Sequence, residues 1–285
     1  MDRLVNTAQA EAWNGYEGEQ WARSQDRWDA VNDGFNQPLL DAAGIADTDY
    51  VLDVGCGAGR TTRLAARRAN RGNALGLDLS GPMLEKARDS ALREGVENIS
   101  FVQGDAQVHA FDAEGFDAVI SRYGVTFFAD PVAAFANLHR ALRSGGQLAF
   151  ICAAEAEANE WLEALASLEG ILPLGGFGRP GGPGMFSLTD PDRIRTLVTA
   201  GGFAEVDVQR IAVPGKWGAD AADAAAFLLG SGPGRHLLSQ VGPQQQTQAR
   251  QALTATLRRH EADGAVWLRS SSWLVTAVRG GAAQH

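Results

Sequence analysis

Three alternating glycines near the first strongly apolar run have the type and spacing to hold a ligand. They are Gly55, Gly57 and Gly59, in the stretch VLDVGCGAGRTTRLA at residues 51–65. Gly55 permits a tight turn after a strand, Gly57 lets the backbone approach a ligand, and Gly59 allows close packing where a helix begins. The free N–H groups at that helix start favour a negative or polar group. Alone, the pattern indicates only a strand, a turn and a helix.

Two carboxylates follow the glycines at matching places. Asp78 ends the next apolar run, about nineteen residues after Gly59, which is the interval at which a βαβ unit presents an acid to ribose hydroxyls. A carboxylate can accept two hydrogen bonds from a cis-diol, although Asp78 could instead cap the helix that begins in LSGPM. Asp105 ends the third run, from which it could reach an adenine amino group. Together these residues predict a nucleoside-containing cofactor.

The glycine spacing bears on which cofactor this is. A dinucleotide site of the GxGxxG type would place its third glycine at position 60, where the chain has Arg60. The spacing here is GxGxG. A nicotinamide-dependent oxidoreductase still shares the order of strand, glycines, helix and acid, and it stays open as an alternative.

The order of apolar runs and helical stretches predicts the sheet that would position these residues. Strands are expected at residues 50–55, 73–79, 99–105, 116–122, 146–152, 205–213 and 271–279. Helix starts are marked where Ser80, Asp130, and Thr189 or Asp190 come just before a proline. Strands in alternation with helices indicate an α/β fold. We expect a Rossmann-like, doubly wound, mostly parallel seven-stranded sheet with helical cap segments.

Changes in composition divide the chain into segments. The predicted segments are an N-terminal helical cover (1–45), a cofactor-binding core (46–155), a helix with a Gly/Pro-rich lid (156–188), a continuation of the core (189–215), a helical cap insertion (216–262), and a final strand with a tail (263–285).

Composition excludes several kinds of protein. Thirty-four acidic and twenty-five basic residues give a formal net charge of −9, which would repel a phosphate backbone, so no nucleic-acid partner is expected. The only cysteines, Cys56 and Cys152, form neither a disulfide framework nor a metal site. No apolar run approaches the roughly 18 residues of a membrane span. We therefore expect a cytoplasmic protein that has no metal and does not bind a membrane.

The motif series DVGCGAG, LDLS, QGDA and FDAVISRYG, followed by LHRALRSGGQLAF, resembles that of class I S-adenosylmethionine-dependent methyltransferases. It is most similar to the small-molecule branch called type 11, which is typified by ubiquinone and menaquinone methyltransferases. The resemblance covers residues 50–155 well and residues 189–214 more loosely. It implies S-adenosylmethionine as the cofactor, with binding residues Asp53, Gly55, Cys56, Gly57, Gly59, Asp78, Leu79, Met83, Asp105, Ala106 and Arg122.

The resemblance also implies a role for each of these positions. The glycines would contact the methionine part of the cofactor, Asp78 would hold the ribose, and Asp105 would face the adenine. The remaining implied roles are Leu79 and Met83 beside the adenine ring, Ala106 flanking it, Arg122 beside the reactive end, and Asp53 ordering backbone amides.

Methyl transfer needs a general base only if the acceptor must lose a proton. Two candidates are Tyr123, just after the fourth predicted strand, and His109, just after the third. Each has an alternative interpretation, with Tyr123 in the pocket wall and His109 in a surface loop. The aromatic residues expected near a small acceptor are Trp13, Tyr16, Trp21, Phe127, Phe128, Phe177 and Trp217.

The resulting hypothesis is a methyltransferase that acts on a C, N or O atom of a small organic acceptor, which is expected to be apolar or aromatic. A non-catalytic module that binds S-adenosylmethionine is a second alternative, since a fold alone does not establish turnover. The oligomeric state is left open, with a homodimer as one option.

Overall fold

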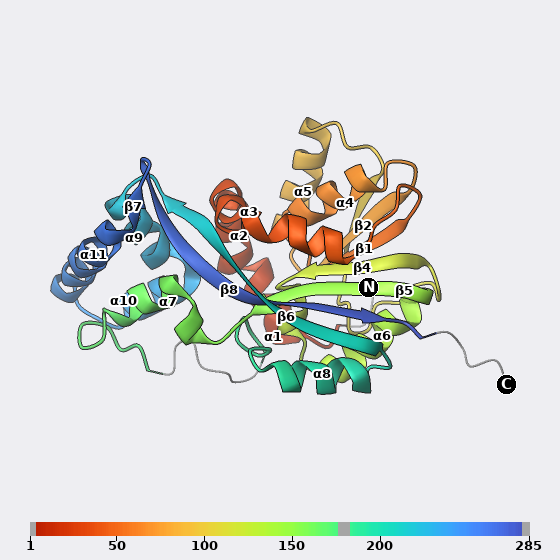
Figure 1. The fold of residues 1–285 in the computed structure, drawn as a ribbon. Coiled ribbons are helices and arrows are strands. Elements are labelled where there is room, and N and C mark those ends of the chain that lie inside the picture. Colours follow the sequence, from red (N-terminus) through yellow and green to blue (C-terminus); the bar gives the residue numbers. More distant parts are fainter. Residues whose placement is uncertain (1–3, 176–182, 281–285) are drawn as a thin grey trace.

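The computed structural model describes residues 4–175 and 183–280, and one mixed sheet runs through its centre (Figure 1). Its strands lie in the order β3-β2-β1-β4-β5-β8-β6, and the two-residue β7 pairs with β8. Their bounds are β1 (Tyr50–Val54), β2 (Asn73–Asp78), β3 (Ile99–Gln103), β4 (Phe116–Arg122), β5 (Leu142–Ala153), β6 (Ala204–Gly218), β7 (Glu261–Ala262) and β8 (Ala265–Val278). Strands β3 to β5 pair in parallel, and β8 is antiparallel to both β5 and β6. The predicted Rossmann-like, mostly parallel sheet is confirmed, with β7 as a short addition.

Helices cover both faces of this sheet (Figure 1). The helices of the core are α4 (Arg60–Arg68), α5 (Gly81–Arg93), α6 (Pro131–Ala141) and α8 (Pro191–Ala200), and the short 3-10 helices are η1 (Gly124–Phe127), η2 (Ala156–Ala158) and η3 (Arg258–His260). The side chains of Ser80, Asp130 and Asp190 each accept a backbone N–H at the start of a helix. These are the predicted N-caps, and Asp190 rather than Thr189 is the cap of α8.

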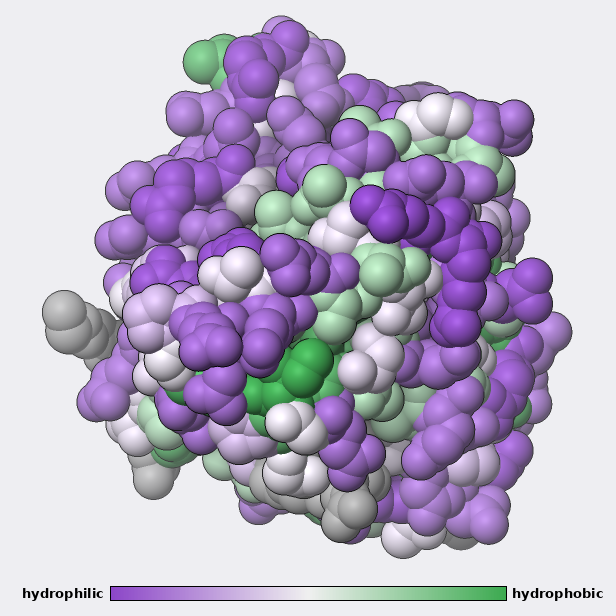
Figure 2. Space-filling view, turned by 90° about the vertical axis from the view of Figure 1, so that its left-hand side faces the viewer, coloured by the Kyte–Doolittle hydropathy of each residue, from purple (hydrophilic) through white to green (hydrophobic). Residues whose placement is uncertain are grey.

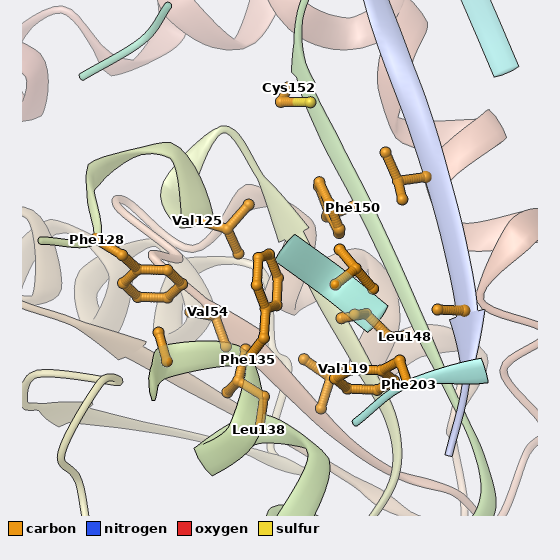
Figure 3. Close-up of a cluster of buried hydrophobic side chains, with 14 of the residues drawn as sticks. Val54, Val119, Val125, Phe128, Phe135, Leu138, Leu148, Phe150, Cys152 and Phe203 are labelled. Atoms are coloured by element: carbon orange, nitrogen blue, oxygen red, sulfur yellow. The ribbon is translucent and has the colours of Figure 1, made fainter. Parts of the chain in front are cut away.

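Below the sheet as drawn in Figure 1, α6 and α8 close a large apolar core, which Figure 3 shows in close-up. The rings of Phe135 from α6 and Phe150 from β5 stack with centroids 5.7 Å apart, and both side chains are fully buried. Burying one such side chain contributes roughly 1.5–3 kcal/mol. This core packs against the strands β1, β2, β4 and β5, and the predicted site residues follow the carboxyl ends of several of these strands.

The N-terminal region forms three helices, α1 (Thr7–Asn14), α2 (Tyr16–Arg23) and α3 (Gln25–Ala42). Helix α3 is part of the core on the other face of the sheet, because Phe35 and Leu39 are fully buried in one cluster with Val51 of β1. The segment expected as a cover thus also contains a structural helix.

Strands β6 and β8 continue past the rest of the sheet as a two-stranded ribbon (Figure 1). Residues 272–276 of β8 pair with both β5 and β6, whereas residues 267–271 pair with β6 and not with β5. The predicted strands were too short here because a pairing partner extends them, and residues 216–218 belong to β6 rather than to the insertion. The ribbon carries the cap helices α9 (Ala221–Gly230), α10 (Gly232–Ser239) and α11 (Pro243–Leu257).

The cap has its own apolar core. It joins α9, α10 and α11 to Trp217 of β6, to Leu165 of α7 (Glu160–Ala166) and to Leu168 and Leu172 after that helix. The outer face at this end of the molecule carries mainly hydrophilic side chains around a small hydrophobic hollow (Figure 2). None of the helices in the described parts of the chain has the length and apolar character needed to cross a membrane.

Candidate cofactor and acceptor pocket

One pocket lies at the carboxyl ends of β1 to β4 and beneath the N-terminal helices. It contains about 1150 Å³ of space, part of which is open to solvent. The predicted residues that line it are Trp13, Trp21, Gly55, Cys56, Gly57, Asp78, Leu79, Met83, Asp105, Ala106, Arg122, Tyr123, Phe127 and Phe128. Parallel α/β sheets bind ligands at this edge.

The glycine loop has the backbone that only glycine adopts easily. Gly55, Gly57 and Gly59 have φ angles of 65°, 55° and 74°. A Cβ on Gly55 would lie 2.5 Å from the Cα of Gly124, and a Cβ on Gly57 would lie 2.6 Å from Cε of Met83. The loop therefore brings bare backbone to the pocket, and a side chain at position 57 would fill space beside Met83. Gly59 is the residue at the N-terminus of α4.

Asp78 lies in the pocket wall at the end of β2. Its Oδ2 accepts the N–H of Gly57 at 2.7 Å, and its Oδ1 accepts that of Ser80 at 2.8 Å. Burial raises the pKa of this carboxyl above its usual value, against the lowering effect of the backbone hydrogen bonds. Since a carboxylate has about four acceptor sites, Asp78 keeps capacity for a hydroxyl donor from the pocket. Helix α5 is capped by Ser80, so Asp78 is not needed as its cap.

Asp53, before the glycine loop, and Cys56, within it, are both buried. Asp53 accepts the hydroxyls of Thr61 and Thr62 at 2.7 and 2.6 Å, and it does not line the pocket. The expected role in ordering backbone amides is therefore corrected, because this carboxylate holds the first turn of α4 by two threonine hydroxyls. Burial raises the pKa of the Cys56 thiol, which does line the pocket, so the sulfur is a neutral wall atom.

Asp105 also has partners that the sequence did not predict. Its carboxylate accepts N–H groups from Val5, Asn6 and Gln107, and it is 2% exposed. Asn6 also lines the pocket. The N-terminal segment therefore reaches the place that the resemblance implies for adenine.

The two candidate bases differ in where they lie relative to the pocket: Tyr123 lines it, and His109 does not. The hydroxyl of Tyr123 lies 3.0 Å from Oγ of Ser272 on β8, and burial raises the pKa of Tyr123 to about 12, so it stays protonated at neutral pH. The ring of His109 packs edge-on against Phe111, with centroids 4.8 Å apart, and His109 is not among the described residues that line the pocket. The catalytic role of each residue stays a prediction from the sequence, and Tyr123 forms part of the pocket wall.

The predicted acceptor aromatics are only partly brought together. Tyr16 and Trp217 do not line the pocket among the described residues. The ring of Tyr16 lies beneath the guanidinium of Arg235, and Trp217 is 3% exposed in the cap core, stacked on Trp161. Phe177 lies outside the described residues.

Helix α3 contributes a face that the prediction missed. Gln25, Trp28, Asp29 and Asn32 all line the pocket, at the i, i+3, i+4 and i+7 spacing of one helix face. Arg122 reaches this helix, with Nη2 at 3.7 Å from Oδ1 of Asp29. The sequence contained a signal for this face. The polar residues Gln25, Asp29 and Asn32 precede the buried Phe35 and Leu39 along the same side of α3. Met185 lines the same pocket.

Comparison with known proteins agrees with this geometry. Residues 51–146 match the sequence model of a family described as a methyltransferase domain. The chain is 37% identical over 113 residues to aklanonic acid methyltransferase DauC of Streptomyces sp. strain C5, which covers 39% of this chain and 51% of that protein. It is 38% identical over 104 residues to the ubiquinone/menaquinone biosynthesis C-methyltransferase UbiE of Bradyrhizobium sp., which covers 36% and 40%. The chain thus spans about half, or less, of the length of these relatives.

A solved structure shares the fold. The YcgJ protein of Bacillus subtilis superimposes with a TM-score of 0.57 at 20% identity, covering 88% of this chain and all of that one. The glycine loop, Asp78 at the end of β2 and the parallel strands β2 to β4 all lie within the residues that the family model matches. Residues 51–146 are therefore a methyltransferase domain of the class I, S-adenosylmethionine-dependent type.

Proposed function

We propose that this chain transfers a methyl group from S-adenosylmethionine to a C, N or O atom of a small, apolar or aromatic acceptor. The observation that carries the proposal is one pocket that is lined both by the glycine loop with Asp78 and by the aromatic side chains of Trp13, Trp21 and Phe127. A nucleoside site and an aromatic site thus share one space. Relatives named for aklanonic acid, for ubiquinone and menaquinone, and for a phytyl hydroquinone support an aromatic acceptor.

The residues present fit this cofactor. Asp78 has acceptor capacity for ribose hydroxyls, and the bare backbone at Gly57 leaves room that a Cβ would fill. Arg122 and Asp29 bring opposite charges to the same end of the pocket, which suits a ligand that carries both an ammonium and a carboxylate.

Bound S-adenosylmethionine supplies a methyl group that is already activated on a sulfonium. The protein then mainly has to bind and orient the acceptor, a contribution that reaches about 7–11 kcal/mol in favourable cases. The rings of Trp13 and Phe127 meet edge to face with centroids 5.4 Å apart, and Trp21 stacks on Trp28 at 4.1 Å. These rigid walls would orient a flat acceptor and exclude water from it. The cytoplasmic location, the lack of a nucleic-acid partner and the homodimer option stay predictions from the sequence.

The first test is calorimetric titration of the wild type with S-adenosylmethionine, S-adenosylhomocysteine and NAD. We expect saturable binding of the first two compounds and none of NAD. Asp78→Ala should weaken that binding about 10- to 100-fold, as expected for the loss of hydrogen bonds to a charged group. The control is Asp192→Ala, because that side chain is 92% exposed on α8.

Binding of NAD alone, or of no compound, would contradict the proposal. Formation of S-adenosylhomocysteine on addition of hydroquinones or aromatic acids separates an enzyme from a module that only binds the cofactor.

A further inference from the structure

The carboxylate of Asp105 is fully occupied by protein donors. Its Oδ1 accepts Nδ2 of Asn6 at 2.6 Å and the N–H of Gln107 at 3.1 Å. Its Oδ2 accepts the N–H groups of Val5 at 3.0 Å and Asn6 at 2.9 Å. These four donors match the roughly four acceptor sites of a carboxylate. An adenine amino group would thus find no free acceptor on Asp105.

Both polar atoms of the Asn6 side chain make hydrogen bonds. While Nδ2 donates to Asp105, Oδ1 accepts the N–H of Ala129 at 2.7 Å. Asn6 is 4% exposed, so these bonds are shielded from water. The side-chain amide of Asn6 therefore links the N-terminal segment to two places: Asp105, which follows β3, and Ala129, which follows η1.

The other end of α1 is also tied down. Asn14 donates to the carbonyl of Leu79 at 2.9 Å and accepts the N–H of Gly81 at 2.9 Å, while the hydroxyl of Ser80 donates to the carbonyl of Trp13 at 2.6 Å. Helix α1 is thus held at the carboxyl end of β3 by its start and at that of β2 by its end. At these ties Asn6 and Trp13 line the pocket together with Asp78 and Asp105.

We propose that Val5, Asn6 and Asp105 form an N-terminal clasp, which positions α1 over the nucleoside end of the pocket. Asp105 then acts on the cofactor by holding α1, not by contact with adenine, and cofactor exchange requires the clasp to open. The inference rests on the proposed function for its ligand. The clasp is also present in the ligand-free protein, so the clasp and the proposed function can fail separately.

A direct contact between adenine and Asp105 makes opposite predictions. If adenine replaced the side-chain amide of Asn6 on Asp105, then Asn6→Ala would free the acceptor and leave cofactor affinity unchanged or higher. The clasp predicts lower affinity and faster release, because α1 loses its attachment at one end.

The test measures S-adenosylhomocysteine dissociation by stopped flow in the wild type, in Asn6→Ala and in the control Thr7→Ala. Thr7 is the exposed neighbour of Asn6 at the start of α1. We expect Asn6→Ala to release the ligand about 10- to 100-fold faster than the wild type, which corresponds to the loss of a hydrogen bond to a buried charge. Thr7→Ala should stay within about two-fold. Equal rates for the two variants, or tighter binding by Asn6→Ala, would overturn the proposal.

A second probe is S-inosylhomocysteine, in which an oxo group replaces the 6-amino group of adenine. The clasp predicts that Asp105→Asn changes the affinity for this compound and for S-adenosylhomocysteine by the same factor. A loss confined to the adenine compound would establish direct contact and overturn the clasp.

Hydrogen exchange in the ligand-free protein makes the test independent of ligand binding. Amides of residues 10–14 should exchange slowly in the wild type and at least about tenfold faster in Asn6→Ala, because opening of the clasp exposes α1. If the wild type binds no cofactor but shows this difference, the proposed function fails and the clasp stands. Fast exchange of these amides in the wild type would overturn the clasp.

Discussion

Asp53 shows how burial changes the chemistry of a single residue. It is completely buried, and its Oδ1 has no hydrogen-bond partner among the described residues. Burial raises its pKa from 3.8 to about 6, although the hydroxyls of Thr61 and Thr62 and the charge of Arg122 favour ionisation. Because the folded pKa lies above the unfolded one, this group stabilises the fold fully below pH 3.8 and loses that contribution as the pH rises through about 6.

Replacement of Asp53 with Asn removes this titration and makes the effect measurable. At 1.36 kcal/mol per pKa unit of difference, the free energy of unfolding of the wild type should fall by about 2.5 kcal/mol relative to Asp53→Asn between pH 3.8 and 7. Urea unfolding across this pH range measures the difference. The exposed Asp192→Asn is the control for general charge effects, and a pH-independent gap between wild type and Asp53→Asn would refute the assignment.

At the level of elements, the glycine loop packs closely against the backbone at Gly124, so a side chain at position 55 would have little space. Gly55 and Gly145 both have a positive φ, 65° and 74°. A Cβ at position 55 would meet backbone of Gly124 at 2.5 Å, whereas a Cβ at position 145 has nothing within 4 Å. The two positions therefore separate the cost of the dihedral angle from the cost of the contact.

We expect Gly145→Ala to lose about 1 kcal/mol of unfolding free energy, the cost of a positive φ for alanine. Gly55→Ala should lose about 2–4 kcal/mol, because overpacking against rigid backbone is added. It should also bind S-adenosylhomocysteine more weakly, while Gly145→Ala binds as the wild type does. Urea unfolding and calorimetry of both variants measure these effects, and equal losses would show that loop crowding has no cost.

In the molecule as a whole, one arginine joins α3 to the cap. Arg27 contacts Asp223 of α9 through two nitrogens, Nη1 to Oδ1 at 2.9 Å and Nη2 to Oδ2 at 3.0 Å. It also donates to the carbonyl of Trp217 at 2.9 Å, and its guanidinium lies 4.1 Å from the ring centre of Phe227. The ion pair is partly exposed, so its charge contributes modestly.

We predict that Arg27→Met lowers the free energy of unfolding by about 1–2 kcal/mol, from a bidentate pair and a cation–π contact. Amides of α9 should exchange faster, because the cap loses a link to α3. The control is Arg23→Met, whose pair with Glu19 at 3.5 Å has side chains 60% and 57% exposed and should cost under about 0.5 kcal/mol. Similar exchange of α9 in both variants would show that Arg27 does not couple the cap to α3.

The amino-acid sequence by itself determined the sheet and the edge of the sheet at which the pocket lies. Apolar runs, N-caps and turn glycines are local signals, and acids that follow parallel strands meet at one edge. Gly55, Gly57 and Asp78 were predictable for this reason.

Only the tertiary structure decided which distant side chains meet. Asn6 and Asp105 are 99 positions apart, Tyr123 turns its hydroxyl to Ser272 on β8, and Asp29 faces Arg122 from α3. The lengths of β6 and β8 likewise depend on each other. These pairings depend on how elements pack against one another, and local residue spacing does not encode that packing.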